Sequence, residues 1–437
     1  MKETQSHFKK LLSYFFDTSG IKFLTKWTFM SSLVGVLSGC LSAFFLISLS
    51  TATNYRVDHS YMLFLLPIGG AFVSYLYKKY GRNSSKGNNL ILEQVQIGDQ
   101  KKEDIPLIMT PLVLFGTVVT HLFGGSAGRE GTAVQMGGSM AELVGKLFKV
   151  DSTDRKILLL CGISSGFGSV FGTPLAGTVF AMEVVAIGEM QYFAFIPCFI
   201  SSFVSNFVAL ALGATHSHYE MIQIPDMTFM VILKVIIASI CFGLCSILFS
   251  ELTSTFKYLF NRVLKNPVYK SAFGGLIVII LVYIVGTRDY VGLGLPMISK
   301  SLTEPISSFA FFWKTLFTSI TLGAGFQGGE VTPLFYIGST LGNALGPILN
   351  ISPYFLASLG FVAVFSGATN TPLACFIMGL ELFHGEGVIF LFIACMVSYL
   401  FSGHHGIYSS QKISTPKYPW INLDETESLS TIKQKSS

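Results

Sequence analysis

The segment GISSGFGSVFGTPLA, residues 162–176, returns as GFVAVFSGATNTPLA at residues 360–374. Both copies begin with glycine and end in TPLA, and an acidic residue, Glu183 or Glu381, follows the proline at the same distance. The offset between the copies is 198 residues. A second pair, GREGT at 128–132 and GGEVT at 328–332, is offset by 200 residues. Two separate matches with nearly the same offset indicate an internal repeat of two halves, each roughly 200 residues long.

The composition is that of a membrane protein. Of the 437 residues, 51% are hydrophobic and only 12% are charged, whereas about 25% is usual in soluble domains. Several apolar runs reach the roughly 20 residues that a membrane-spanning helix needs, and others are interrupted by glycine or proline. We therefore expect an all-α polytopic membrane protein. The apolar runs are 27–51, 61–77, 106–123, 157–187, 192–213, 227–249, 272–285, 309–322 and 354–401.

Basic residues predict the orientation in the membrane. Lys and Arg cluster before residue 27, in loop 78–102 and around 146–156 and 257–270, while 216–226 has neither. The positive-inside rule places the basic regions and both termini in the cytoplasm, with the chain in the inner cell membrane. No basic–aromatic module accompanies these loops, so we expect no nucleic-acid partner. The expected parts are an amphipathic cytoplasmic segment (1–26), two membrane repeats (27–213 and 214–410) and a polar cytoplasmic tail (411–437).

The repeated glycine clusters predict broken helices. A helix that begins after such a break presents free N–H groups and its positive dipole end, which together bind anions. Three such starts are expected: after Asn88 and Asn89, after Gly131, and after Val331 and Thr332. Broken spans at matching positions of two repeats mark the binding site of many transporters. The alternative is that the glycines only allow close helix packing.

Glu130 lies at one of these starts, beside Arg129. Its carboxylate is itself an anion, so it can occupy the site when ionised and leave when protonated. The alternative is an acid that only caps the orphan N–H groups of a helix. Glu330, its repeat partner, is a second intramembrane acid and therefore a second candidate for proton transfer.

Four stretches resemble the CLC chloride channel and antiporter family, and the similarity covers roughly residues 27–410. GREGTAVQMGGS at 128–139 resembles the gating-glutamate motif, and GFQGGEVTPLFYIGSTLG at 325–342 resembles the later anion-site motif. SGATNTPLA at 366–374 resembles the following helix, and HHGIYSS at 404–410 resembles the segment with the central tyrosine, here Tyr408. The resemblance implies an inverted repeat whose half-helices meet at a midplane anion site. It also implies a homodimer with one pore per subunit.

Departures from the chloride pattern resemble the fluoride-exporting branch of the family. The first anion motif reads GNNLI at 87–91, threonine replaces proline after the glutamate motif, and valine replaces phenylalanine in the later motif. Fluoride is small and strongly hydrated, so its site must supply strong donors, and amide and hydroxyl groups can donate. The expected anion-binding residues are Asn88, Asn89, Gly131, Thr132, Val331, Thr332 and Tyr408.

The usual inner proton acceptor is absent. Proton-coupled chloride members carry two adjacent glutamates after the repeated helix, and here the pair is Glu183 and Val184. Water or Glu330 could carry the proton instead. The fluoride-branch resemblance implies a fluoride/proton antiporter that exports fluoride, with Glu130 as gating and proton-carrying residue. The expected partners are fluoride, with chloride as the alternative, protons and membrane lipids.

Other functions remain open on the sequence. A chloride/proton antiporter or a passive anion channel could share every motif. An enzyme is disfavoured, because the G-x-S-x-G matches at 124–128 and 162–166 lack the strand–turn–helix context of a hydrolase. The 7 cysteines lie in apolar runs without metal-ligand spacing, so we expect neither a metal nor another cofactor.

Overall fold

The computed structural model describes residues 19–96, 103–418, 420 and 428–431. Its first half contains α2 (Ser19–Asp58), η1 (Ser60–Leu65), α3 (Leu66–Tyr80), η2 (Arg82–Lys86), α4 (Asn88–Gln96), α5 (Met109–Leu122), α6 (Glu130–Leu147), α7 (Ser152–Phe171), α8 (Pro174–Glu183), η4 (Tyr192–Ala194) and α9 (Phe195–Ala211). Its second half contains α10 (Phe229–Val263), α11 (Pro267–Val285), α12 (Leu295–Ser301), α13 (Ala310–Gly323), α14 (Val331–Leu349), α15 (Pro353–Thr369), α16 (Pro372–Leu382) and α17 (Val388–Phe401). Two short strands, β1 (Ala186–Ile187) and β2 (Lys412–Ile413), pair in parallel.

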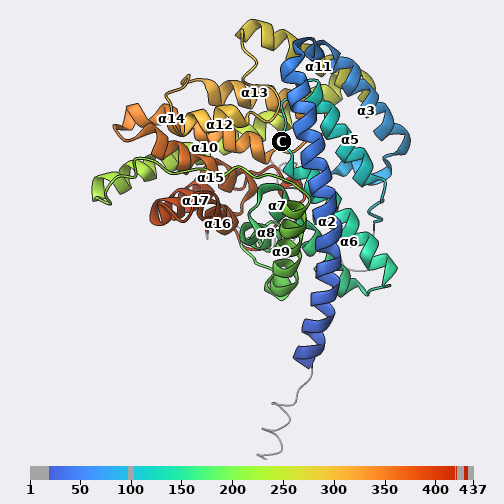
Figure 1. Ribbon diagram of the computed structural model, residues 1–437. Helices are drawn as coiled ribbons and strands as arrows, with labels where there is room; N and C mark the ends of the chain where they lie inside the picture. Colours follow the sequence, from blue (N-terminus) through green and yellow to red (C-terminus); the bar gives the residue numbers. More distant parts are fainter. Residues whose placement is uncertain (1–18, 97–102, 419, 421–427, 432–437) are drawn as a thin grey trace, which may run out of the picture.

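The helices repeat in order, so that α2 to α9 correspond to α10 to α17. Packing follows the same correspondence: α2, α7 and α9 pack on one another in the first half, as α10, α15 and α17 do in the second. The halves meet through equivalent helices, α3 on α11, α8 on α16 and α6 on α14. Figure 1 shows α3 close to α11, and most second-half helices on one side of the long helix α2. The predicted all-helical repeat is confirmed.

Two glutamates show that the repeat is inverted. Glu183, at the end of α8, accepts hydrogen bonds from Leu373 N (3.1 Å) and Ala374 N (2.8 Å) at the start of α16. Glu381, near the end of α16, likewise accepts from the backbone N–H groups of residues 175 and 176, at 2.9 and 2.8 Å, at the start of α8. Each helix therefore ends where its counterpart begins, so α8 and α16 are antiparallel. An axis that reverses equivalent helices is the mark of an inverted repeat.

Glycines bring the central helices of each half into direct contact. A Cβ atom at Gly137 of α6 would overlap the carbonyl oxygen of Gly162 in α7. In the second half, a Cβ atom at Gly338 of α14 would overlap the carbonyl oxygen of Gly360 in α15. The repeated glycines therefore serve both close helix packing and helix breaking, which the sequence alone presented as two alternative explanations.

Within the described residues, five helical stretches are long and apolar enough to cross a membrane: Ser19–Asp58, Ser60–Tyr80, Tyr192–Ala211, Phe229–Val263 and Pro267–Val285. The other predicted runs are shorter or broken. Run 157–187 breaks at Gly172, whose φ is +74°, and run 354–401 becomes the three helices α15, α16 and α17. The breaks place helix ends, with their free N–H groups, inside the protein.

The predicted division of the two chain ends stays a prediction. Residues 1–18 of the predicted segment 1–26 lie outside the described residues, and residues 19–26 belong to α2, which continues past residue 26. The tail 411–437 was expected to be polar and cytoplasmic. In its described part, β2 pairs with β1, and Leu429, only 7% exposed, packs on Ile187 and Ile413. These apolar contacts, which composition alone does not reveal, hold the described part of the tail against the membrane repeats.

Candidate functional site

The Glu130 carboxylate lies on the N-terminus of α14, a helix of the opposite repeat. Glu130 is 1% exposed. Its Oε1 accepts a hydrogen bond from Val331 N at 2.5 Å, and its Oε2 accepts from Thr332 N at 3.3 Å and Thr332 Oγ1 at 3.0 Å. Arg129 N also donates to Oε2, at 2.9 Å. Backbone donors and the positive end of α14 form an anion site, and in this structure the carboxylate fills it.

The loops before α6 and α14 hold the two helix starts together. Gly128 N donates to Gly329 O at 2.7 Å, and Gly329 N donates to Gly128 O at 3.0 Å. A Cβ atom at Gly329 would overlap the Glu130 carboxylate. The repeated glycines are therefore required where the two halves meet, because only a bare backbone lets the carboxylate reach α14.

The other predicted residues around Glu130 contribute unequally. Val331 and Thr332 supply the donors described above. Gly131 lies against the side-chain amide of Asn88, so the start of α4 reaches the start of α6. The Thr132 hydroxyl instead shares a 2.6 Å hydrogen bond with Thr117 Oγ1. Because this hydroxyl is bonded to Thr117, Thr132 acts as a packing residue in this structure. The role of Thr132 in anion binding stays a prediction.

A cavity of about 970 Å³ lies on one side of Glu130. We call it the glutamate cavity, and its lining includes Asn88, Asn89, Gln135, Glu330 and Tyr408. The side-chain oxygens of Asn88 and Gln135 are buried and have no hydrogen-bond partner in the described part of the chain. Unpaired buried amide oxygens are costly, so this wall has capacity for a hydrogen-bond donor such as water.

Glu330 and Glu130 are separated by the start of α14. Glu330 is the N-cap residue of this helix and lines the glutamate cavity. Glu130 lines neither this cavity nor a second cavity on the side of Arg129. The two acids that the repeat predicted are thus close together but differ in access. Glu330 contacts the cavity, and Glu130 is enclosed.

Tyr408 is 5% exposed and lines the glutamate cavity. Its ring lies 6.4 Å from that of Phe180, between centroids. The segment that carries it is held by Asn89, whose Oδ1 accepts a hydrogen bond from Ser410 N at 3.1 Å. This oxygen of Asn89 therefore positions Tyr408, a contact that the sequence did not predict.

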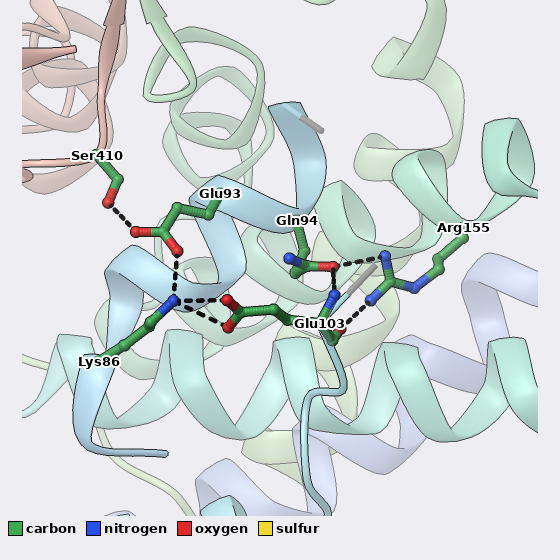
Figure 2. Close-up of polar contacts among 6 residues, drawn as sticks. All are labelled: Lys86, Glu93, Gln94, Glu103, Arg155 and Ser410. Atoms are coloured by element: carbon green, nitrogen blue, oxygen red, sulfur yellow. Dashed lines mark hydrogen bonds and ion pairs between the residues drawn. The ribbon is translucent and has the colours of Figure 1, made fainter. Parts of the chain in front are cut away.

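A polar cluster reinforces the same segment (Figure 2). Ser410 Oγ donates to Glu93 Oε1 at 2.7 Å, and Lys86 Nζ contacts Glu93 Oε2 at 3.1 Å. Lys86 also contacts both carboxylate oxygens of Glu103, at 2.9 and 3.0 Å, and this hydrogen bond raises the pKa of Lys86. Gln94 Oε1 then accepts from Glu103 N and from Arg155 Nη1. The cluster connects the Tyr408 segment through α4 to α7.

The predicted inner proton position is apolar. Val184 is 1% exposed, and both oxygens of Glu183 accept hydrogen bonds from α16.

Sequence reasoning missed Gln135, although a signal existed. It stands in the same motif as Glu130, one turn after Gly131 on a helix that is otherwise mostly apolar at its start.

Comparisons with known proteins agree with this architecture. The family described as voltage gated chloride channel matches residues 69–403. A chloride/fluoride channel protein of Pseudomonas syringae pv. tomato is 43% identical over 420 residues, covering 95% of this chain and 92% of that protein. The crystal structure of a CLC-type fluoride/proton antiporter superposes with a TM-score of 0.86 at 36% identity, covering 90% of this chain and 98% of the other. The crystal structure of a slow cyanobacterial Cl⁻/H⁺ antiporter shares the fold, with a TM-score of 0.74 at 19% identity. The match covers 86% of this chain and 94% of the other.

Proposed function

This chain belongs to the voltage-gated chloride channel (CLC) family, and on that basis we propose that it exports fluoride from the cytoplasm in exchange for protons. The observation that carries the proposal is the Glu130 carboxylate on the donors of Val331 and Thr332. The similarity to a CLC-type fluoride/proton antiporter and to a chloride/fluoride channel protein supports the choice of substrate.

Glu130 couples the two ions by competition. When ionised, its carboxylate occupies the anion site on α14. When protonated, it loses the charge that these donors attract, so it leaves and a fluoride ion takes its place. Each exchange therefore moves one side chain, one proton and one anion through the same position. The enclosure of Glu130 supports this scheme, because an open path beside it would allow the anion to leak.

The donors favour a small anion. Thr332 presents both N–H and O–H to the site, and the Asn88 amide lies against Gly131. Fluoride gains more than chloride from strong donors, because its charge is concentrated and its hydration shell must be replaced. We therefore assign fluoride as the exported ion and chloride as a weaker substrate.

Glu330 is our candidate for the inner proton carrier. Glu183 caps α16 and Val184 cannot titrate, so the usual inner acid is replaced. Glu330 directly precedes the donors Val331 and Thr332 as the N-cap residue of α14, and it lines the glutamate cavity. This cavity is also lined by Lys78, Arg82 and Lys257, from regions that the positive-inside rule places in the cytoplasm.

The remaining assignments rest on the family and on charge. We propose a homodimer in the inner cell membrane, surrounded by lipid, with both termini in the cytoplasm. Crosslinking in native membranes at protein densities too low for random contact tests the dimer. Protease access from the two sides of sealed vesicles tests the position of the termini.

The test of function is ion flux from proteoliposomes. Vesicles loaded with fluoride or chloride are monitored with ion-selective electrodes while external pH is recorded. A fluoride gradient should drive protons uphill, and fluoride efflux should be faster than chloride efflux. Fluoride efflux without proton movement would make the protein a passive channel, and faster coupled chloride flux would make it a chloride antiporter.

A further inference from the structure

A second cavity, of about 700 Å³, lies on the Arg129 side of Glu130. We call it the arginine cavity. Arg56 from the last turn of α2, Arg129 beside Glu130 and Arg288 after α11 all line it, together with His216 and Thr53. Its lining residues come from both repeats, so the fold rather than one loop creates it.

Several buried donors around the arginine cavity lack partners. The Nε atoms of Arg56 and Arg129 and the Thr53 hydroxyl are buried without a hydrogen-bond partner in the described part of the chain. A buried donor left unpaired costs about 1–3 kcal/mol, and more when it is charged. Such a concentration of unpaired donors around one cavity indicates that a ligand with acceptor atoms completes it.

The charged side chains that line the arginine cavity favour a negatively charged ligand. Among its lining residues three are arginines and one, Asp289, is acidic. Asp289 already accepts a 2.7 Å hydrogen bond from Thr287 Oγ1. Arg129 is held over the ring of Phe171, with 6.0 Å between Cζ and the ring centroid. The guanidinium groups are therefore positioned but not neutralised, which suits an anion.

Backbone contacts fix the opposite wall. A Cβ atom at Gly292 would lie 2.8 Å from Arg56 Nη2, so the guanidinium rests directly on this glycine. Lys314, fully buried, donates to the carbonyl oxygens of Tyr290 and Gly292 at 3.2 and 2.7 Å and so holds the same loop. The loop that supports the Arg56 guanidinium therefore requires glycine at position 292 and is held in place by the buried Lys314.

We propose that the arginine cavity is a second anion site, which holds a small inorganic anion between the surface and the position that Glu130 occupies. The ion exchanges with the site on α14 when Glu130 moves. The exchange rests on the proposed function, whereas anion binding in the arginine cavity does not depend on proton coupling or on fluoride selectivity. A lipid phosphate shares the chemistry, but the half-buried position of Arg129, with its Nε atom fully buried next to Glu130, favours a free ion.

The test is bromide binding to crystals of the intact protein, followed by anomalous scattering. A bromide peak is expected in the arginine cavity, in contact with the Arg56 or Arg129 guanidinium. Removing one of the facing charges should weaken binding about tenfold or more, so the peak should fade in Arg56→Met. Arg288→Met, an exposed position, provides a second variant that should fold. Arg262→Met at the exposed end of α10 is the control.

The outcomes separate this proposal from the proposed function. Bromide elsewhere in the crystal but not in this cavity overturns it, as does a peak of unchanged height in Arg56→Met and Arg288→Met. Elongated density that continues into an acyl chain would assign the cavity to a lipid headgroup and also overturn it. If bromide binds here while fluoride efflux moves no protons, the second site stands and the antiport proposal fails.

Discussion

Replacing Thr332 with valine tests how the site selects its anion. Valine has nearly the same shape as threonine but lacks the hydroxyl that donates to Glu130 Oε2 at 3.0 Å. The backbone donors of Val331 and Thr332 remain in place. The variant therefore removes one donor out of the group without breaking the start of α14.

The size of the effect follows from the charge of the acceptor. A hydrogen bond to a charged group contributes about 1.5–3 kcal/mol, which corresponds to roughly 10- to 150-fold in an equilibrium constant. The hydroxyl serves whichever anion is bound, and fluoride depends on it most. We expect fluoride affinity to fall about tenfold or more, and chloride affinity by only about threefold.

The measurement is titration calorimetry with fluoride and with chloride. It is made in a Glu130→Gln background, so that the ionised carboxylate no longer competes for the donors. Thr340→Val is the matched control, because Thr340 lies further along α14 and donates to the carbonyl of Tyr336 at 2.8 Å. It should leave both affinities unchanged.

Two results would refute this reasoning. If both ions weaken equally in Thr332→Val, the hydroxyl has no selective role. If neither weakens while Thr340→Val behaves as wild type, the bound anion does not use the position that the Glu130 carboxylate fills in this structure.

Three further changes test neighbouring parts of the account. Glu330→Gln should abolish or strongly reduce proton movement during fluoride efflux, measured by pH recording, because an amide cannot carry the proton; wild-type coupling would remove Glu330 from the path. Glu183→Gln should lower the melting temperature in detergent, because an N-cap acceptor contributes about 0.5–2 kcal/mol, and should leave the coupling ratio unchanged; an altered ratio would mean that Glu183 carries protons. The raised pKa of Lys86 predicts that its contact with Glu103 stabilises the Tyr408 segment below the ordinary lysine pKa of 10.5 and is lost only as pH rises above the folded-state value. At pH 7, Lys86→Met should therefore increase hydrogen exchange around Ser410, and the difference from wild type should disappear only at very alkaline pH, after correction for intrinsic rates. Equal protection in both proteins at pH 7 would argue against the contact.

Much of the fold could be predicted because the sequence contains an internal repeat. The TPLA segments and the glycine clusters located the half-helices, and α4, α6 and α14 begin within one or two residues of the predicted breaks. Helix starts depend on local glycine, proline and capping residues, which the sequence displays directly. The position of Glu130 on the α14 donors followed from the same local rules once the two halves were assumed to meet.

Contacts between distant residues could not be predicted. The sequence assigned no role to Glu183, which caps α16 through partners that lie 190 and 191 residues away. Asn89 was predicted to bind an anion, which stays a prediction, and its side-chain oxygen accepts a hydrogen bond from Ser410 N that the sequence did not indicate. Nothing in the sequence around Arg56 indicates that it lines the same cavity as Arg129. Such contacts arise from the packing of the two halves and leave no periodicity in the chain.

Proton transport by Glu130→Gln tests the central claim most directly. Glutamine keeps the size of the side chain and can still contact α14, but it can neither ionise nor carry a proton. Proteoliposomes that contain the variant are loaded with fluoride, and external pH is recorded during efflux beside wild type. The account predicts that a fluoride gradient moves protons uphill through wild type and moves none through Glu130→Gln. Uphill proton movement by the variant at the wild-type ratio would contradict it, and Glu130 would then be only the buried cap of α14.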